Sequence, residues 1–362
     1  MNTIEDAINK KIGEVRIDTL DISFGEVISL HSQNELIIQP EYQRLFRWSN
    51  DQKSRLIESI LLQLPIPQVF VIENETGVYE LIDGLQRISS VINFIDYEQI
   101  STLEEPLSLS GCDIIPELNN QTFNNLSLTL KLRIKRSTVR MVVIKKQSNS
   151  MLKYEMFKRL NTGGSLLSAQ EVRNCSVRMF GPDGITFYEF LIKCANNQDY
   201  KTCTSSIYHG DKEQKLDEEL VLRFFAAKNN PDMFREKRKI KDWLDSYLET
   251  ILTKKTSFNY NKEYEDFEKV FMHLSKILGE YAFVRHRNNI PIGSLAPAYF
   301  EAIAIGTFKS LPILEEKYDK IRDAIVNATT GPDFKESIGP GSNKMSSLTR
   351  RIELIAEAIQ NV

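Results

Sequence analysis

Residues 78–96 read VYELIDGLQRISSVINFID and predict a strand, a sharp corner and a helix in immediate succession. An apolar run ends at Asp83, and apolar residues then recur at the spacing of a helix with one buried face. Gly84 occupies the corner, where glycine allows a sharp turn and close approach of a ligand to the backbone. A helix N-terminus attracts anions, and Gln86 and Arg87 add an amide and a guanidinium fork. We therefore predict a phosphate site here, with Asp83 either holding a metal ion or orienting Arg87.

Length and composition indicate a globular protein with two domains. A chain of 362 residues exceeds what one hydrophobic core usually fills. The net charge of −3 predicts no nucleic-acid partner by itself, so any basic surface must be local. No apolar run reaches the roughly 18–20 residues of a membrane span, and the first residues lack a signal-peptide core. We therefore expect a cytoplasmic protein with no membrane partner. Its four cysteines lack CxxC pairs and are expected to be buried, reduced packing residues.

Periodicity predicts the α+β class, with a mixed α/β domain over residues 1–150 and a mostly α-helical domain over residues 151–362. Strands are expected at residues 35–39, 68–73 and 138–144, and residues 69–82 read as a hairpin. Asn50 is predicted to cap the first long helix, and Ser168 with Glu171 forms a capping-box pattern. The expected helices cover residues 50–64, 151–160, 186–196, 216–228, 240–252, 264–284, 297–308 and 314–327, with a last one ending at 359.

Two further polar clusters allow functional and purely structural interpretations. Residues 40–48, PEYQRLFRW, combine aromatic residues such as Tyr42 with the polar residues Gln43 and Arg44. Aromatic rings and arginines together can clamp a nucleotide or single-stranded nucleic acid. The same residues would also suit a loop whose aromatics fill the core. Residues 157–174 contain an Asn-Thr-Gly-Gly turn that can form an anion nest, or an ordinary corner between two helices.

Basic residues concentrate in residues 131–146, which contain no acidic residue. Lys135, Arg136 and Arg140 are the candidate DNA-binding residues of this stretch, although a solvated strand and its flanking loop would explain them equally well. The shorter group at residues 285–287 is expected on a solvated helix surface. Signatures of P-loop NTPases, Rossmann enzymes, zincins and α/β-hydrolases are missing from the sequence.

The three polar clusters in this order resemble one family. Tyr42-Gln-Arg with Trp48, Asp83-Gly-Leu-Gln-Arg and the Arg159-Leu-Asn-Thr-Gly-Gly turn are similar to motifs of the N-terminal domain of GmrSD-type modification-dependent restriction systems. This domain belongs to the ParB/sulfiredoxin-like superfamily, and the resemblance covers roughly residues 15–180. It implies a site for a nucleoside triphosphate with Mg²⁺, where GTP or ATP is favoured over CTP or UTP. Hydrolysis of this nucleotide would control DNA restriction.

The resemblance also implies roles for individual residues. Asp83 would bind the metal or activate water, and Gln86 and Arg87 would contact the phosphates, which makes these three the catalytic candidates. Leu85 replaces the usual first glutamine of the motif and predicts slow turnover. The remaining nucleotide-binding candidates are Tyr42, Gln43, Arg44, Gly84, Arg159, Asn161, Gly163 and Gly164.

The partners expected from the resemblance are DNA, in modified or foreign form, and a nuclease. The helical half shows no His-Asn-His nuclease pattern, so we expect a separately encoded nuclease subunit. Homo-oligomer formation is left open. Two other functions compete with the nucleotide-binding subunit. One is a non-catalytic DNA-binding adaptor, and the other is a self-contained, metal-dependent DNA nuclease.

Overall fold

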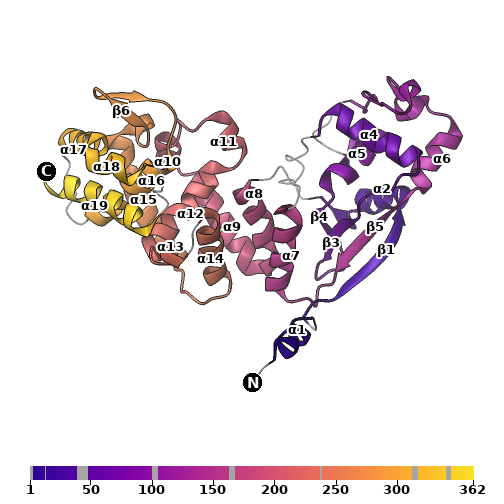
Figure 1. Ribbon diagram of the computed structural model, residues 1–362, viewed down its shortest axis with the longest axis horizontal. Coiled ribbons are helices and arrows are strands. Elements are labelled where there is room, and N and C mark those ends of the chain that lie inside the picture. The colour runs from indigo at the N-terminus through magenta and orange to yellow at the C-terminus, as the bar shows by residue number, and fades with distance from the viewer. Residues whose placement is uncertain are drawn as a thin grey trace. The chain divides into compact units, whose positions relative to one another are not determined.

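The computed structural model describes residues 3–12, 14–38, 48–99, 105–162, 168–236, 239–311, 317–339 and 344–362. The chain divides into two compact units, Met1–Ser165 and Leu166–Val362, both drawn in Figure 1. The division falls one helix later than the expected boundary after residue 150. The α+β class is confirmed, since a mixed sheet occupies the first unit and helices dominate the second.

The first unit holds the sheet and the helices that cover it. Its strands are β1 Ile17–Ser23, β2 Leu36–Ile37, β3 Val69–Glu73, β4 Tyr79–Asp83 and β5 Thr138–Ile144. Its α-helices are α1 Ile4–Ile12, α2 Phe24–Ser32, α4 Asn50–Leu61, α5 Leu85–Ile95, α6 Leu128–Arg136 and α7 Ser150–Thr162. Short 3₁₀ turns cover Tyr97–Gln99, Pro116–Leu118 and Phe123–Asn125.

The sheet has the order β1-β5-β3-β4-β2. The pairs β1–β5 and β3–β4 are antiparallel, whereas β3–β5 and β2–β4 are parallel. The predicted strand at residues 138–144 and the predicted hairpin are confirmed. The sequence interpretation missed α1, β1, α2 and α6. Side chains of β1 are mostly exposed, so its pattern lacks the alternation of a half-buried strand.

Helices α2, α4, α5 and α6 pack on one another beside the sheet, and α7 packs on β4 (Figure 1). Ile57 of α4, Val71 of β3 and Ile92 of α5 are fully buried in the core that results. The predicted cap of α4 was wrong by one residue. Ser49 is the N-cap, and it forms a capping box with Gln52. The Ser49 hydroxyl accepts from the Gln52 N–H, and the Gln52 side-chain oxygen accepts from the Ser49 N–H.

The described residues of the second unit form helices and one hairpin, β6 Arg285–Arg287 and β7 Ile290–Ile292. Its longer helices are α8 Ala169–Val177, α9 Gly181–Ala195, α12 Leu216–Asn229, α14 Ile240–Leu252, α15 Tyr260–Ile277, α16 Pro297–Ser310, α17 Tyr318–Thr330 and α19 Met345–Gln360. Its shorter helices are α10 Gln198–Cys203, α11 His209–Glu213, α13 Met233–Glu236 and α18 Pro332–Ser337, with 3₁₀ turns at Arg178–Phe180 and Gly279–Tyr281. The predicted helix at residues 240–252 is confirmed.

The prediction of one helix over residues 264–284 was wrong. Helix α15 ends at Ile277 because Gly279, with φ of 59°, takes the left-handed conformation that commonly ends a helix. The chain then enters the β6–β7 hairpin, so residues 285–287 lie on a strand and not on a helix surface. Asn288 and Asn289 both have positive φ, as the two-residue turn of such a hairpin requires.

A chain of ion pairs runs through the interior of the second unit. Arg173 donates to Asp245 at 2.8 Å and to Glu219 at 3.0 Å. Glu219 also accepts from Arg223, which donates to Glu301 at 2.7 Å. Burial alone would raise the pKa of Glu219, but the neighbouring charges of Arg223 and Arg173 outweigh it and lower that pKa. At the other end of this series of ion pairs, Arg351 of α19 donates a hydrogen bond to the second carboxylate oxygen of Glu301.

The predicted state of the cysteines is confirmed, because Cys112, Cys175, Cys194 and Cys203 are all free and buried. Burial raises the pKa of the Cys112 thiol to about 11. No helix in the described part of the chain is long and apolar enough to cross a membrane.

Candidate functional site

The predicted strand, corner and helix are present at the end of β4. The strand ends at Asp83, Gly84 forms the corner with φ of 100° and ψ of 11°, and α5 begins at Leu85. Such a left-handed conformation is strained for any residue with a side chain. The N-cap residue, Gly84, has no side chain that could cap the first turn of α5, and that turn contains no acidic residue. The positive end of the helix dipole is therefore not compensated within the helix.

Close packing is a second reason for glycine at position 84. A Cβ atom placed there would lie 2.4 Å from Cγ1 of Val69, which is buried at the start of β3. The corner is thus held against the neighbouring strand. This contact sets the point at which α5 begins, and therefore the position of Gln86 and Arg87.

Arg87 ties the helix to both strands of the hairpin. Its Nη2 donates to Oδ2 of Asp83 at 2.8 Å and to the backbone carbonyl of Gln68 at 3.0 Å. The side chains of Asp83 and Arg87 are 30% and 19% exposed, so the ion pair is open to solvent on one side. The Nε of Arg87 is buried and has no hydrogen-bond partner among the residues that the structure describes. Asp83 therefore orients the arginine, which was one of its two predicted roles.

Gln86 connects the corner to the second polar cluster. Its Oε1 accepts a hydrogen bond from the backbone N–H of Trp48 at 3.1 Å. Trp48 is the last residue of the cluster at residues 40–48, so the structure brings the end of that cluster to the start of α5. Neither the Gln68 carbonyl nor the Trp48 amide could be predicted, because backbone groups leave no signature in the residue types.

Several predicted site residues lie outside the part of the chain that the structure describes. They are Tyr42, Gln43, Arg44, Gly163 and Gly164, together with the side chain of Asn161. Arg159, by contrast, lies in the part of the chain that the structure describes. Its side chain is 81% exposed and lies 3.7 Å from Glu155, one turn earlier on α7. Since α7 packs on β4, the cluster at residues 157–174 begins on a helix that contacts the strand ending in Asp83.

The capping box predicted at Ser168 is present at the start of α8. The Ser168 hydroxyl accepts from the Glu171 N–H, and the Glu171 carboxylate accepts from the Ser168 N–H. Two residues later, Arg173 enters the buried chain of ion pairs in the second unit. These residues therefore have structural roles within their own unit.

A metal ion at Asp83 would depend on additional ligands. The described residues contain no group of three His, Cys, Asp or Glu side chains that could hold a metal. Mg²⁺, however, is commonly bound by one or two carboxylates together with substrate phosphates and water. A single carboxylate beside a phosphate site fits this pattern.

Comparison with known proteins identifies the segment that carries this site. Residues 24–178 match the family described as GmrSD restriction endonuclease, N-terminal domain. This segment belongs to the GmrSD N-terminal domain family. The match confirms the resemblance on which the sequence interpretation rested, and it indicates a component of a restriction or defence system. No curated protein matches the chain.

Within the GmrSD domain, the predicted DNA-binding residues fall on α6 and β5. Arg140 forms two hydrogen bonds with Asp21 across the β1–β5 pair, at 3.0 and 3.1 Å. The hydrogen bond from Arg140 lowers the pKa of Asp21. Lys135 lies over the ring of Phe123, with its Nζ 5.7 Å from the ring centroid. Arg140 is thus already neutralised locally, whereas Lys135 and Arg136 lie together in the last turn of α6.

A second basic feature lies beyond the GmrSD domain, on the β6–β7 hairpin. Arg285 pairs with Ile292 and Arg287 with Ile290, so all four side chains share one face of the ribbon. All four are exposed, and neither arginine forms an ion pair within the described residues. The Asn-Asn pair between two short alternating segments was the available sequence signal for this hairpin.

Proposed function

We propose that the GmrSD domain binds the phosphate groups of a nucleoside triphosphate at the N-terminus of α5 and hydrolyses it slowly. We further propose that this nucleotide cycle controls the cleavage of DNA by a separately encoded nuclease. The observation that carries the proposal is the buried, unpaired Nε of Arg87 beside the glycine corner. A buried charged donor without a partner costs roughly 1–3 kcal/mol, which an oxygen of a bound phosphate would recover.

The Asp83–Arg87 ion pair supplies a physical reason for coupled nucleotide and metal binding. A guanidinium binds phosphate through two parallel hydrogen bonds, so phosphate competes with the single contact to Asp83. When Arg87 turns to phosphate, the Asp83 carboxylate is left for Mg²⁺. The cation adds charge compensation for the phosphates when it is bound. We therefore expect Mg²⁺ to bind together with nucleotide and only weakly without it.

Leu85 bears on the rate of hydrolysis. It is the first residue of α5 and occupies the position at which the family motif has a glutamine. An aliphatic side chain can neither donate nor accept a hydrogen bond, so it cannot orient an attacking water molecule. The proposal therefore expects binding with slow turnover.

Nucleotide titration with Mg²⁺ tests the proposal. Wild-type protein should bind at least one of GTP, ATP, CTP and UTP in isothermal titration calorimetry. We expect Arg87→Ala to weaken this binding roughly 10- to 150-fold, because charge-assisted hydrogen bonds contribute about 1.5–3 kcal/mol. Arg87→Lys should recover only part of the loss, since lysine lacks the planar fork.

Arg140→Ala is the matched control, because it removes an arginine that is paired with Asp21 elsewhere on the sheet. This variant should bind nucleotide like the wild type. Failure of the wild type to bind any of the four nucleotides contradicts the proposal. Equal affinities for wild type and Arg87→Ala contradict the assigned site.

A second candidate function is DNA binding by the helical unit, and the β6–β7 ribbon favours it. Two exposed arginines without ion pairs, on the same face as Ile290 and Ile292, suit contacts with phosphates and a nucleic-acid groove. Figure 1 shows the ribbon at the surface of its unit.

Salt dependence distinguishes this ribbon from the basic stretch of the first unit. We expect Arg285→Ala with Arg287→Ala to reduce the slope of log affinity against log salt by about 2, measured by fluorescence anisotropy on duplex DNA. The double variant with Lys135→Ala and Arg136→Ala tests the basic stretch of the first unit by the same salt-dependence measurement. Arg140→Ala should leave the slope unchanged, because that charge is already paired. An unchanged slope for the ribbon variant excludes the ribbon as the DNA contact.

A further inference from the structure

One face of the β6–β7 ribbon combines two arginines with two isoleucines. Arg285 pairs with Ile292 and Arg287 with Ile290. Directly opposed side chains of antiparallel strands lie on the same face, with Cβ atoms about 4.5–5.5 Å apart. Both arginines are exposed, and the exposed fractions of Ile290 and Ile292 are 63% and 44%. Each cross-strand pair therefore places a cation beside an apolar side chain in solvent.

The opposite face of the ribbon packs on its own unit. His286 and Pro291 form the cross-strand pair of that face, both are half-buried, and β6 contacts α17. Burial lowers the pKa of His286, and the nearby positive charge of Arg322 on α17 lowers that pKa further. Phe283 and Val284 are buried just before β6 and anchor the base of the hairpin. The face with the arginines and isoleucines is consequently the outward one.

The charge of this outward face selects an anionic partner. Neither arginine forms an ion pair within the described residues, and residues 281–300 contain no aspartate or glutamate. Asn288 and Asn289 are exposed and form the turn at the tip of the ribbon. Their amides find hydrogen-bond partners on the edges of bases but none in hydrocarbon, so the tip suits DNA and not a lipid membrane.

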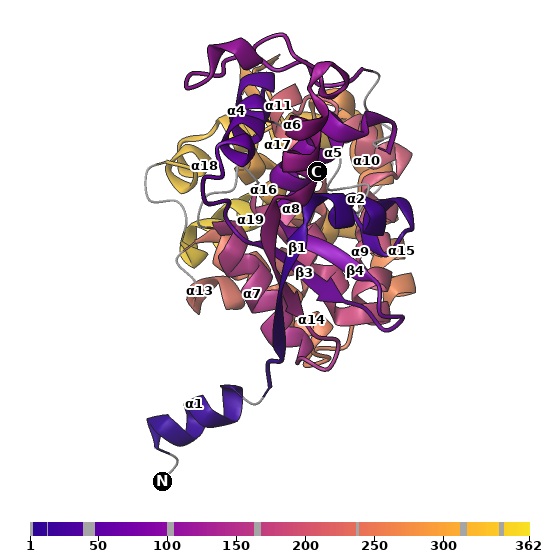
Figure 2. The ribbon, with the colours of Figure 1, turned by 90° about the vertical axis from the view of Figure 1, so that its right-hand side faces the viewer.

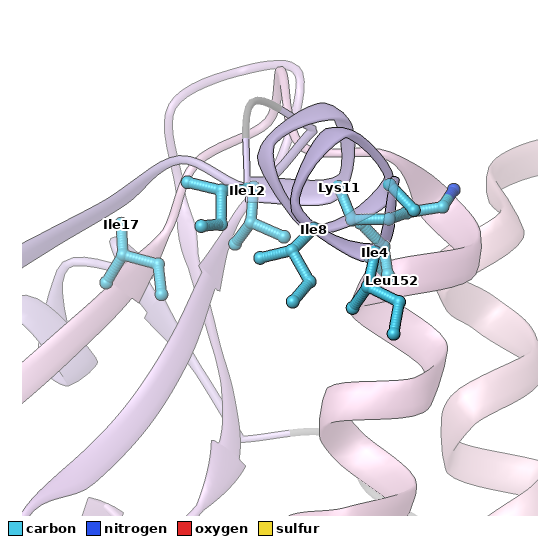
Figure 3. Close-up of a pocket in the computed structure, with 8 residues that line it drawn as sticks. Ile4, Ile8, Lys11, Ile12, Ile17 and Leu152 are labelled. Carbon is cyan, nitrogen blue, oxygen red and sulfur yellow. The ribbon is translucent and has the colours of Figure 1, made fainter. Parts of the chain in front are cut away.

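The apolar groove at α1 lacks such a selecting charge. Figure 2 shows α1 beyond the start of β1. The labelled apolar residues in Figure 3 line this groove and are Ile4, Ile8, Ile12, Ile17 and Leu152. Lys11 is the charged residue of the lining, and it is already paired with Glu14 at 2.9 Å. This lining therefore holds no charge that would choose a partner, whereas the ribbon does.

The side chains and dimensions of the ribbon decide which groove of DNA it suits. Isoleucine has neither a donor nor an acceptor, so Ile290 and Ile292 cannot read the hydrogen-bond pattern of the major groove. In the minor groove, such apolar side chains insert between base pairs as wedges. Two strands about 4.8 Å apart, with side chains on both faces, are too bulky for a groove roughly 6 Å wide. Entry therefore requires the groove to open, which kinks the duplex toward the major groove.

We infer that the β6–β7 ribbon enters the minor groove of duplex DNA and kinks it, with Ile290 and Ile292 wedged at one base step. The inference deepens, and rests on, the DNA binding proposed for the helical unit. Arg285 and Arg287 bind the phosphates that flank the opened step, and the asparagine amides contact base edges. A·T pairs are the preferred step, because the N2 amino group of guanine obstructs the floor of the minor groove.

Fluorescence resonance energy transfer across a short, end-labelled duplex measures the kink with the full chain. Saturating wild-type protein should shorten the distance between the ends, since wedging side chains kink DNA by about 20–90°. The double variant with Ile290→Ala and Ile292→Ala should abolish the shortening. It should also weaken binding about tenfold or more, because the apolar area of the wedge is lost. Its salt slope should equal that of the wild type, because no charge is removed.

Ile185→Ala is the matched control for the isoleucine variant. Ile185 is 42% exposed on α9 of the same unit, so this substitution removes a comparable apolar side chain away from the ribbon. It should retain both the affinity and the kink of the wild type. Circular dichroism checks that both variants are folded.

Inosine substitution in the DNA tests the choice of groove. Replacing guanine with inosine removes the N2 amino group from the minor groove and leaves the major-groove pattern unchanged. Binding of the wild type to a G·C-rich duplex should therefore tighten roughly fivefold or more. An affinity that inosine does not change overturns the placement in the minor groove.

The remaining outcomes separate the wedge from the DNA binding on which it rests. If Arg285→Ala with Arg287→Ala lowers the salt slope but the wild type leaves DNA straight, the wedge is overturned and the ribbon remains the DNA contact. If that variant leaves the slope unchanged, both fall. Binding to vesicles of phosphatidylcholine and phosphatidylserine that depends on the isoleucines as strongly as DNA binding does also overturns the inference.

Discussion

Replacing Arg173 with alanine should destabilise the helical unit by about 3–5 kcal/mol, which is the usual cost of removing one partner from a buried ion pair. Arg173 is 2% exposed and compensates Asp245, which is 4% exposed, as well as Glu219. Without the guanidinium, both carboxylates would remain buried beside an insufficient positive charge. The loss should exceed that of the side-chain packing alone, because the desolvation of the charges is then no longer offset.

Urea denaturation can measure this loss. Trp243 is fully buried on α14, next to the end of the ion-pair chain at Asp245, and it reports the unfolding of this unit by fluorescence. A Trp48→Phe background removes the signal of the first unit. Arg350→Ala is the control, because its ion pair with Asp333 is exposed and should contribute about 1 kcal/mol or less. Equal losses for the two variants would show that the buried chain adds no more than a surface pair.

Gly84→Ala should destabilise the strand–corner–helix by about 3 kcal/mol and abolish nucleotide binding. Two costs combine at this position. The φ of 100° is unfavourable for alanine, and its methyl group would approach Val69 Cγ1 to 2.4 Å. Relief of the clash requires the start of α5 to move, and this movement displaces Arg87 from the Gln68 carbonyl.

Gly77→Ala separates the two costs. Gly77 has φ of 86° in the turn of the same hairpin, but nothing lies within 4 Å of a Cβ placed there. This control should lose only about 1 kcal/mol, the penalty of the backbone conformation. Hydrogen–deuterium exchange of the amides of α5 measures both variants locally. If Gly84→Ala loses no more stability than Gly77→Ala, the close contact between position 84 and Val69 is unimportant.

Local patterns predicted the elements whose apolar residues follow a clear period. The strand at residues 138–144, the helix at 240–252 and the capping box at Ser168 have the expected positions. The failures share a cause. Strand β1 is almost wholly exposed, and α15 ends at Ile277, two residues before Gly279, although apolar residues continue after it. In both places the pattern of apolar residues carries little information about where the element lies.

The sequence by itself determined the α+β class, the family motifs in their order, and the strand, glycine corner and helix around Gly84. It could do so because glycine, a following helical period and an arginine are local properties of consecutive residues. The tertiary structure alone decided that Val69 holds the corner, that Arg87 reaches Gln68, and that Arg140 is neutralised by Asp21. These contacts join segments far apart in the chain, and packing sets them, so residue types in one segment cannot specify them.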